Sequence, residues 1–143
     1  DIKVIFSGRR EPLRKDVLAS MDKIVEETEN NKRGILNICL NYGGQEEIVD
    51  ATKKIVELVN NGELNIDDVD KNNFYKYLYN DLPPLDLLIR TSGEYRLSNF
   101  MPYQSTYSEF YFTDILFPDF DNREFDKAIE SYNKRDRRRN VLY

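Results

Sequence analysis

The chain has 143 residues, which suits one ordinary domain, and its 40% hydrophobic content with 8 Phe and 10 Tyr is too high for a disordered chain. Its 21 Lys and Arg against 26 Asp and Glu give a net charge of -5, so bulk charge indicates no nucleic-acid partner. The chain has no His, which excludes His-based catalytic triads and the zinc signatures that require His.

Strand and helix patterns alternate in the first half of the chain. A β-rich run at residues 3–6 predicts a strand, and apolar residues at three- and four-residue intervals over 13–28 predict an amphipathic helix. The nearly continuous apolar run 35–40 predicts a second strand, covered on both faces. Helical spacing returns over 46–59, and a third helical stretch is expected at 72–79.

The same alternation continues in the second half. Residues 85–89 predict a strand, and a short helix is expected to open after Ser98, with Pro102 in its first turn. The aromatic, alternating run 107–113 predicts a fourth strand, and Asp121 predicts the cap of a final helix. Four strands separated by helices predict an α/β fold with a parallel sheet and helices on both faces.

The one cysteine, Cys39, lies inside the apolar run 35–40. A single thiol can neither close an internal disulfide nor form a Cys-rich zinc site. We interpret Cys39 as a small buried hydrophobic residue rather than a reactive thiol. No apolar run approaches the roughly 18 residues of a membrane span and no signal peptide is visible, so a cytoplasmic protein is expected.

Two loops that follow strands are candidate ligand sites, because ligands of open parallel sheets bind beyond the carboxyl ends of the strands. The first loop runs from Asn41 through Tyr42 to Gly43 and Gly44. Its paired glycines allow close backbone approach just before a helix N-terminus, which suits an anion. An ordinary strand-to-helix turn explains the same residues.

The second loop, after the strand predicted at 85–89, contains more side chains that could bind a ligand. Arg90, Arg96 and Ser98 would place two guanidinium groups and a hydroxyl near a helix N-terminus. Forked donors fit phosphate oxygens, so a diphosphate pocket is a natural interpretation. The alternative is a salt-bridged loop in which the arginines pair with Glu94 or Asp86.

Glu109 stands out because it interrupts an apolar and aromatic strand. A carboxylate there is costly to bury unless it meets a cation or a metal ion. Mg²⁺ bridging Glu109 and diphosphate oxygens would satisfy it, and an arginine partner would do so equally.

A basic run occupies residues 134–139, at the end of the last predicted helix. Placement against the helix C-terminal dipole on a solvated face explains it. The functional alternative is that it reaches an anionic ligand in a neighbouring subunit.

Several motifs occur in the order found in one enzyme family. They occupy residues 41–44, 86–94, 96–100, 107–112 and 117–120. Together they resemble the cis-prenyltransferases, or isoprenyl transferases, whose bacterial type is undecaprenyl diphosphate synthase. The resemblance covers essentially the whole chain and corresponds to the C-terminal part of the family's catalytic domain. Residues 1–143 are therefore expected to form a single α/β domain within a longer catalytic domain.

The resemblance implies condensation of isopentenyl diphosphate with an allylic diphosphate, such as farnesyl diphosphate, to a cis-polyprenyl diphosphate. It implies Mg²⁺ as cofactor, a homodimer, and a product lipid that brings the enzyme to the membrane surface. By position it implies Arg90 and Arg96 as catalytic residues and Glu109 as a metal ligand. The residues that it implies for substrate binding are Arg90, Arg96, Ser98, Asn41, Gly43, Gly44, Arg137 and Arg138.

Some family features are absent from these residues. The N-terminal Asp-Gly-Asn-Gly-Arg type motif and the Ser-x-x-Asn type motif are missing, so the 143 residues alone are predicted to be inactive. Gln45 replaces a common arginine, and Arg139 with Asn140 replaces an aromatic-glycine pair. A non-catalytic partner subunit of a prenyltransferase dimer is the alternative. A general phosphate-binding α/β module explains fewer of the motifs.

Overall fold

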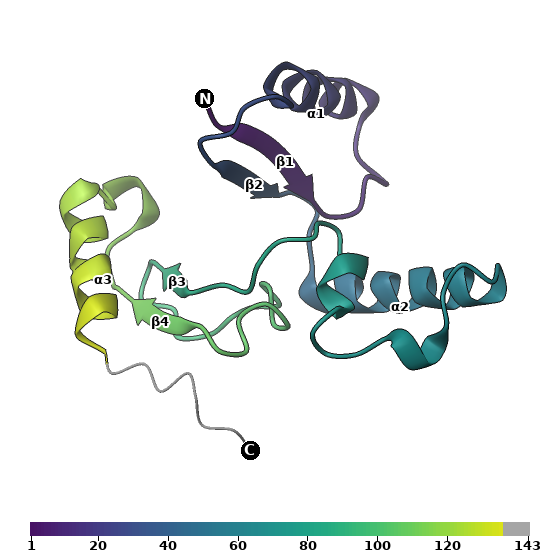
Figure 1. Cartoon of the computed structure of the whole chain (residues 1–143). Helices are drawn as coiled ribbons and strands as arrows, with labels where there is room; N and C mark the ends of the chain where they lie inside the picture. The colour runs from purple at the N-terminus through teal and green to yellow at the C-terminus, as the bar shows by residue number, and fades with distance from the viewer. Residues whose placement is uncertain (136–143) are drawn as a thin grey trace. The chain divides into compact units, whose positions relative to one another are not determined.

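Strands and helices alternate along residues 1–135, the part of the chain that the structure, a computed structural model, describes (Figure 1). These residues fall into two compact units. The first contains Asp1–Pro83 and Asn99–Tyr103, and the second contains Pro84–Ser98 and the described chain from Gln104. The chain therefore returns to the first unit for a short segment before it completes the second.

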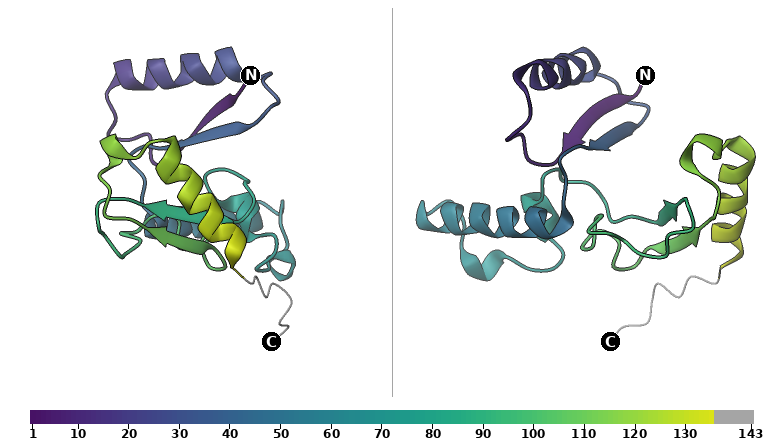
Figure 2. Two further views of the ribbon diagram at one scale, coloured as in Figure 1. Left: turned by 90° about the vertical axis from the view of Figure 1, so that its left-hand side faces the viewer. Right: turned by 180° about the vertical axis from the view of Figure 1, so that it is seen from behind.

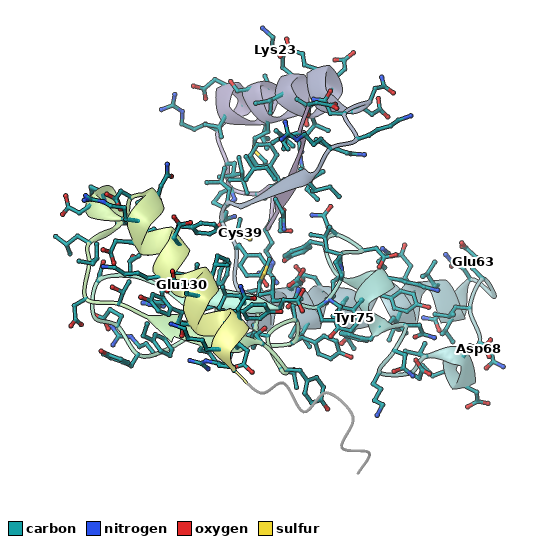
Figure 3. The ribbon with its side chains drawn as sticks, turned by 60° about the vertical axis from the view of Figure 1, so that its left-hand side comes forward. Lys23, Cys39, Glu63, Asp68, Tyr75 and Glu130 are labelled. Carbon is teal, nitrogen blue, oxygen red and sulfur yellow. The ribbon has the colours of Figure 1, made fainter. Side chains whose placement is uncertain are left out.

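The first unit is built on a parallel pair of strands. Its elements are β1 (Lys3–Ser7), α1 (Lys15–Thr28), β2 (Ile35–Cys39), α2 (Gly44–Asn60) and the 3₁₀ turns η1 (Ile66–Asp68) and η2 (Phe74–Tyr77). β1 pairs with β2 in parallel, with Lys3 opposite Ile35. α1 buries Met21 toward the strands, while Lys23 projects away from them (Figure 3). The two predicted strands and both amphipathic helices are confirmed.

β2 is less covered than its apolar sequence predicts. Ile35 is 57% exposed and Leu36 is 50% exposed, although consecutive strand residues point to opposite faces. Within residues 1–135, β2 is hydrogen-bonded only to β1. The expectation of a strand covered on both faces is therefore wrong for the described structure, because a two-stranded pair leaves part of both faces open.

The helical stretch expected at residues 72–79 is confirmed only in part, as a short 3₁₀ helix rather than an α-helix. The segment forms the 3₁₀ turn η2, preceded by an irregular loop. The Asp70 carboxylate accepts the backbone N–H groups of Asn72 at 2.8 Å and Asn73 at 2.9 Å. Short polar side chains that bind nearby N–H groups compete with helical hydrogen bonds, and this favours turns over a continuous helix.

The second unit contains another parallel strand pair. Its elements are β3 (Leu87–Arg90), β4 (Glu109–Phe112), the 3₁₀ turn η3 (Phe117–Asp119) and α3 (Asn122–Lys134). α3 lies beside the strand pair and packs on β4 (Figure 2). The Asp121 carboxylate caps α3 by accepting the N–H groups of Arg123 at 2.9 Å and Glu124 at 3.1 Å. The predicted capping role of Asp121 is confirmed.

No helix opens after Ser98 in the described structure, so that prediction is wrong. Residues 99–107 form successive turns. Ser98, Asn99 and Met101 have φ angles of 47°, 64° and 46°, whereas a right-handed helix needs a negative φ. Pro102 therefore does not stand in a first helical turn.

The predicted α/β class with parallel strands is confirmed, with one parallel pair in each unit. The extent of the domain remains a prediction. No helix within residues 1–135 is long and apolar enough to span a membrane.

A charged cluster holds α2 in the first unit. The Arg9 guanidinium donates to both Asp50 carboxylate oxygens at 2.8 Å, and the Tyr79 hydroxyl donates to Asp50 Oδ2 at 2.7 Å. These bonds lower the pKa of Asp50 to about 2, with the Arg9 hydrogen bond as the main cause. The cluster joins the loop after β1, α2 and the chain after η2.

Asp50→Asn is expected to lower the free energy of unfolding by about 1 kcal/mol at pH 6, a modest value because the Asp50 carboxylate is partly exposed. A pKa held below the unfolded value stabilises the fold above about pH 4, and that stabilisation is lost as the pH falls toward 2. The difference between the parent chain and the variant in urea titrations should therefore shrink between pH 5 and pH 2. A difference that stays constant over this range would contradict the assignment.

Candidate functional site

The Asn41 side chain ties the first candidate loop to the loop after β1. Its amide donates to the carbonyl oxygens of Arg9 at 2.8 Å and Glu11 at 3.0 Å. Its backbone is left-handed, with a φ of 50°, a conformation that asparagine adopts more readily than most residues. The amide of Asn41 thus has a structural task at the carboxyl ends of β1 and β2.

The N-terminus of α2 is closed by Asn99. The Asn99 carbonyl accepts the N–H of Gly44 at 2.7 Å, and its side-chain oxygen accepts the N–H of Gln45 at 2.8 Å. Its amide nitrogen donates to the Glu46 carboxylate at 2.9 Å, and this bond is the first cause that lowers the pKa of Glu46. Two of the N–H groups that suited an anion are thus engaged within the chain.

The paired glycines make room for the returning segment 99–103. A Cβ on Gly44 would lie 2.0 Å from Cδ of Pro102 and 3.1 Å from the carbonyl oxygen of Asn99. A Cβ on Gly43 would lie 2.0 Å from the Glu46 carboxylate and 2.8 Å from the Asn99 amide nitrogen. The structure therefore explains Gly43 and Gly44 by close approach of their own chain.

Gly44→Ala is expected to cost more stability than Gly43→Ala. The Pro102 ring cannot swing aside, so the alanine at position 44 should overpack and lower the free energy of unfolding by about 2 kcal/mol. The Glu46 side chain can move, so the change at position 43 should cost less than about 1 kcal/mol. Urea titration of the two variants measures both values, and equal losses would contradict the packing argument.

Tyr42 anchors the same loop to a buried carboxylate. Glu47 is only 2% exposed and accepts the Tyr42 hydroxyl at 2.5 Å and the N–H of Tyr79 at 3.1 Å. Burial, followed by the Glu47 hydrogen bond, raises the pKa of Tyr42. Sequence reasoning missed Glu47, although it shares helical spacing with Ala51 and Ile55, which are also buried.

Cys39 is half-buried at the end of β2. Burial, followed by the charge of Glu47, raises the pKa of its thiol to about 11. A thiol with that pKa stays protonated near neutral pH and is a weak nucleophile, which supports the interpretation of Cys39 as a packing residue.

Arg90 is the last residue of β3 and is half-buried. Its backbone continues the ladder, because its carbonyl accepts the N–H of Thr113 at 3.0 Å. Among the residues that the structure describes, no carboxylate forms an ion pair with Arg90. Its guanidinium is thus a cation at the carboxyl end of a parallel strand, where ligands bind.

Arg96 differs from Arg90 because it forms an ion pair with Glu94. The salt-bridged alternative therefore holds for Arg96 and not for Arg90. Ser98 is exposed, with the positive φ of 47°. The hydroxyl of Ser98 and the guanidinium of Arg96 are both accessible to solvent.

Backbone hydrogen bonds fix the start of this loop onto the chain after β4. The N–H of Ser92 donates to the carbonyl of Ile115 at 2.8 Å, and the N–H of Gly93 donates to Thr113 at 2.9 Å. Gly93 has a φ of 67°, which glycine adopts without strain. The loop that follows Arg90 is thereby held in one conformation.

Glu109 meets an arginine. Arg135 donates through Nη1 to the Glu109 carboxylate at 2.6 Å and through Nη2 to the carbonyl of Phe110 at 2.8 Å. Of the two partners expected for this carboxylate, the structure contains the arginine. Residues 1–135 hold no group of three His, Cys, Asp or Glu side chains that could bind a metal ion together.

Arg90 and Glu109 are separated within the strand pair. Glu109 lies opposite Leu87 and Arg90 lies opposite Phe112, so they are three residues apart along the strands, about 10 Å. An odd number of steps also places them on opposite faces. The structure brings Arg90, Arg96 and Ser98 into one unit with Glu109, while Asn41, Gly43 and Gly44 belong to the other unit. The predicted sites Arg137 and Arg138 lie outside the described residues.

The chain is thus an α/β protein with a candidate anion site on the loop after β3. A family model described as undecaprenyl diphosphate synthase matches residues 1–140. The chain belongs to this prenyltransferase family, as its motifs predict.

Relatives support the assignment. The chain is 51% identical over 137 residues to an isoprenyl transferase of Fusobacterium nucleatum, covering 96% of this chain and 57% of that protein. It is 48% identical over 143 residues to an isoprenyl transferase of Streptococcus thermophilus, with the same coverage of 96% and 57%. The chain therefore spans just over half the length of these relatives.

A solved structure shares the fold. Lavandulyl diphosphate synthase from Lavandula x intermedia, in complex with dimethylallyl diphosphate, matches with a TM-score of 0.90 and 36% identity. The match covers 96% of this chain and 59% of that one.

Proposed function

We propose that this chain supplies the isopentenyl diphosphate site of a cis-prenyltransferase, which condenses isopentenyl diphosphate with an allylic diphosphate. The observation that carries the proposal is Arg90, a half-buried cation at the carboxyl end of β3 without a carboxylate partner among residues 1–135. Family membership supplies the reaction class. The solved relative was found with an allylic diphosphate, dimethylallyl diphosphate.

The proposed roles follow from the chemistry of the side chains. Arg90 offers a planar fork of N–H donors that fits two oxygens of a diphosphate. Arg96 can turn from Glu94 to the ligand, since their ion pair is exposed and such pairs are weak. The Ser98 hydroxyl donates a further hydrogen bond. These groups hold the diphosphate of isopentenyl diphosphate while the carbon-carbon bond forms at its other end.

Dependence on Mg²⁺ belongs to the proposed activity of the whole enzyme, and Glu109 is the residue of this chain that the family motif assigns to the metal. The ion would stabilise the negative charge on the departing allylic diphosphate. The Glu109 carboxylate would have to break its hydrogen bond with Arg135 before it could bind the metal ion. Assembly into a homodimer and location at the membrane surface are further parts of the proposal. The presence of Arg90, Arg96, Ser98 and Glu109 together favours an enzyme over a non-catalytic partner subunit.

Arg90→Ala is expected to weaken binding of isopentenyl diphosphate by about 10- to 100-fold, because it removes charge-assisted hydrogen bonds. Isothermal titration of the diphosphate into the chain measures the change. Arg14→Ala is the matched control, since it removes an exposed arginine whose partner Asp16 lies in the same helical turn. Equal affinities for the parent chain and Arg90→Ala would remove Arg90 from the site.

Incorporation of radiolabelled isopentenyl diphosphate, with farnesyl diphosphate and Mg²⁺, tests the reaction itself in the enzyme as it occurs in the cell. Absence of incorporation by the cellular enzyme would refute the proposed activity.

A further inference from the structure

Thr113 joins the chain after β4 to the loop after β3, and all the residues concerned belong to the second unit. Its N–H donates to the carbonyl of Arg90 at 3.0 Å, and its carbonyl accepts the N–H of Gly93 at 2.9 Å. Two residues further on, the carbonyl of Ile115 accepts the N–H of Ser92 at 2.8 Å. The start of the loop is therefore held by one short stretch of chain that begins at Thr113.

The hydroxyl of Thr113 shapes this stretch. It accepts the N–H of Ile115 at 3.3 Å, and so closes a turn between the two residues. Threonine hydroxyls that bind a backbone N–H two residues ahead favour such turns. The turn directs the Ile115 carbonyl toward the N–H of Ser92. Because Thr113 is half-buried, water competes less for these groups than it does at an exposed turn.

The backbone of Ser92 needs this support. Its φ of 69° lies in the left-handed region, which is unfavourable for a serine and persists where surrounding bonds hold it. Gly93 follows with a φ of 67°, so the two residues turn the chain between Arg90 and Arg96. Three peptide bonds separate Gly93 from Arg96, so a fixed turn keeps their Cα atoms within about 11 Å of one another.

We propose that Thr113 is a positioning residue for the diphosphate site. Its hydroxyl fixes the stretch that holds the turn at Ser92 and Gly93. That turn sets the separation of Arg90 and Arg96, which must reach the same diphosphate. Thr113 acts through this loop and does not touch the substrate. The inference rests on the proposed function, because the ligand is the one proposed there.

The first test compares Thr113→Val and Thr113→Ser with the parent chain by hydrogen exchange. Valine keeps the β-branched shape and removes the hydroxyl, whereas serine keeps the hydroxyl and removes a methyl group. Exchange of the Ile115 and Ser92 amides should accelerate in Thr113→Val and not in Thr113→Ser. The Glu109 amide, which donates to the carbonyl of Asp86 at the other end of the strand pair, should exchange as before. Unchanged exchange in Thr113→Val would overturn the role of the hydroxyl.

The second test measures affinity for isopentenyl diphosphate by isothermal titration. Affinity should fall on the order of tenfold in Thr113→Val, as the two arginines lose their fixed separation, and by less than about twofold in Thr113→Ser. Thr52→Val is the matched control, since it removes a hydroxyl that donates to the carbonyl of Ile48 within α2. This control should change neither the affinity nor the exchange of the Ser92 amide.

A double variant separates the spacing of the arginines from general loosening. If Thr113 acts on the separation of Arg90 and Arg96, its hydroxyl matters little once Arg96 is gone. Thr113→Val should therefore weaken binding far less in an Arg96→Ala background than in the parent chain. Equal losses in both backgrounds would overturn the positioning role.

The outcomes for Thr113 and for the proposed function are distinct. If the parent chain binds isopentenyl diphosphate and Thr113→Val binds it equally well, the positioning role fails and the proposed function stands. If the parent chain itself does not bind, the proposed function fails and the positioning role fails with it. Loss of binding in Thr113→Val with recovery in Thr113→Ser supports both.

Discussion

Gly8→Ala is expected to lower the free energy of unfolding by about 3–5 kcal/mol, because a strained backbone and a steric clash act together. Gly8 has a φ of 132°, which L-residues rarely adopt, and a Cβ there would lie 2.0 Å from the carbonyl oxygen of Leu40. Backbone hydrogen bonds join the chain around Gly8 to the chain after β2: the N–H of Leu40 donates to the carbonyl of Ser7, and the N–H of Arg9 donates to the carbonyl of Asn41. The clash therefore has no flexible side chain to relieve it.

Gly62→Ala is the matched control for this substitution. Gly62 follows α2 with a φ of 74°, and a Cβ there would have no atom within 4 Å. The change should cost only the left-handed backbone, about 1 kcal/mol. Urea titration followed by circular dichroism measures both variants. A loss at Gly8 no larger than the loss at Gly62 would contradict a cost from the contact with Leu40.

The elements that sequence patterns predict well are those whose cause is local. Apolar runs and helical spacing predicted four strands and three helices near their observed positions, and the cap at Asp121 depends on residues two and three positions away. The helical stretch at 72–79 is shorter than predicted and the helix after Ser98 is absent, because side chains and contacts outside the pattern decide the backbone there. Asp70 redirects nearby N–H groups, and Asn99 bonds to α2.

In the candidate site too, the sequence identifies residues whose roles depend on local features and misses those whose roles depend on distant partners. Arg90 at a strand end and the loop to Ser98 could be recognised from residue type and spacing. Asn99 and Glu47 could not be assigned in this way, because their roles depend on partners distant in sequence: Asn99 on Gly44 and Glu47 on Tyr79. The sequence alone does not decide whether Glu109 pairs with an arginine or with a metal ion, because either cation satisfies a carboxylate. The structure shows that the partner is Arg135, which lies distant in sequence.

Glu47→Ala is expected to lower the free energy of unfolding by about 3–4 kcal/mol, since it removes a buried acceptor and leaves a cavity. The Tyr42 hydroxyl and the Tyr79 N–H both lose this acceptor, and Glu47 is 2% exposed, so little water can replace it. Glu57→Ala, at an exposed position of the same helix, is the control and should change stability by less than about 0.5 kcal/mol.

Tyr42→Phe isolates the bond between the hydroxyl and the carboxylate, and should cost about 1.5–2 kcal/mol. In the double variant the two losses should fall short of their sum by about 1.5 kcal/mol, because each single change already removes the shared bond. Additive losses would mean that Glu47 stabilises the fold through contacts other than the one with the Tyr42 hydroxyl. A measured coupling would instead establish that Glu47 holds Tyr42, and with it the glycine turn onto which Asn99 closes.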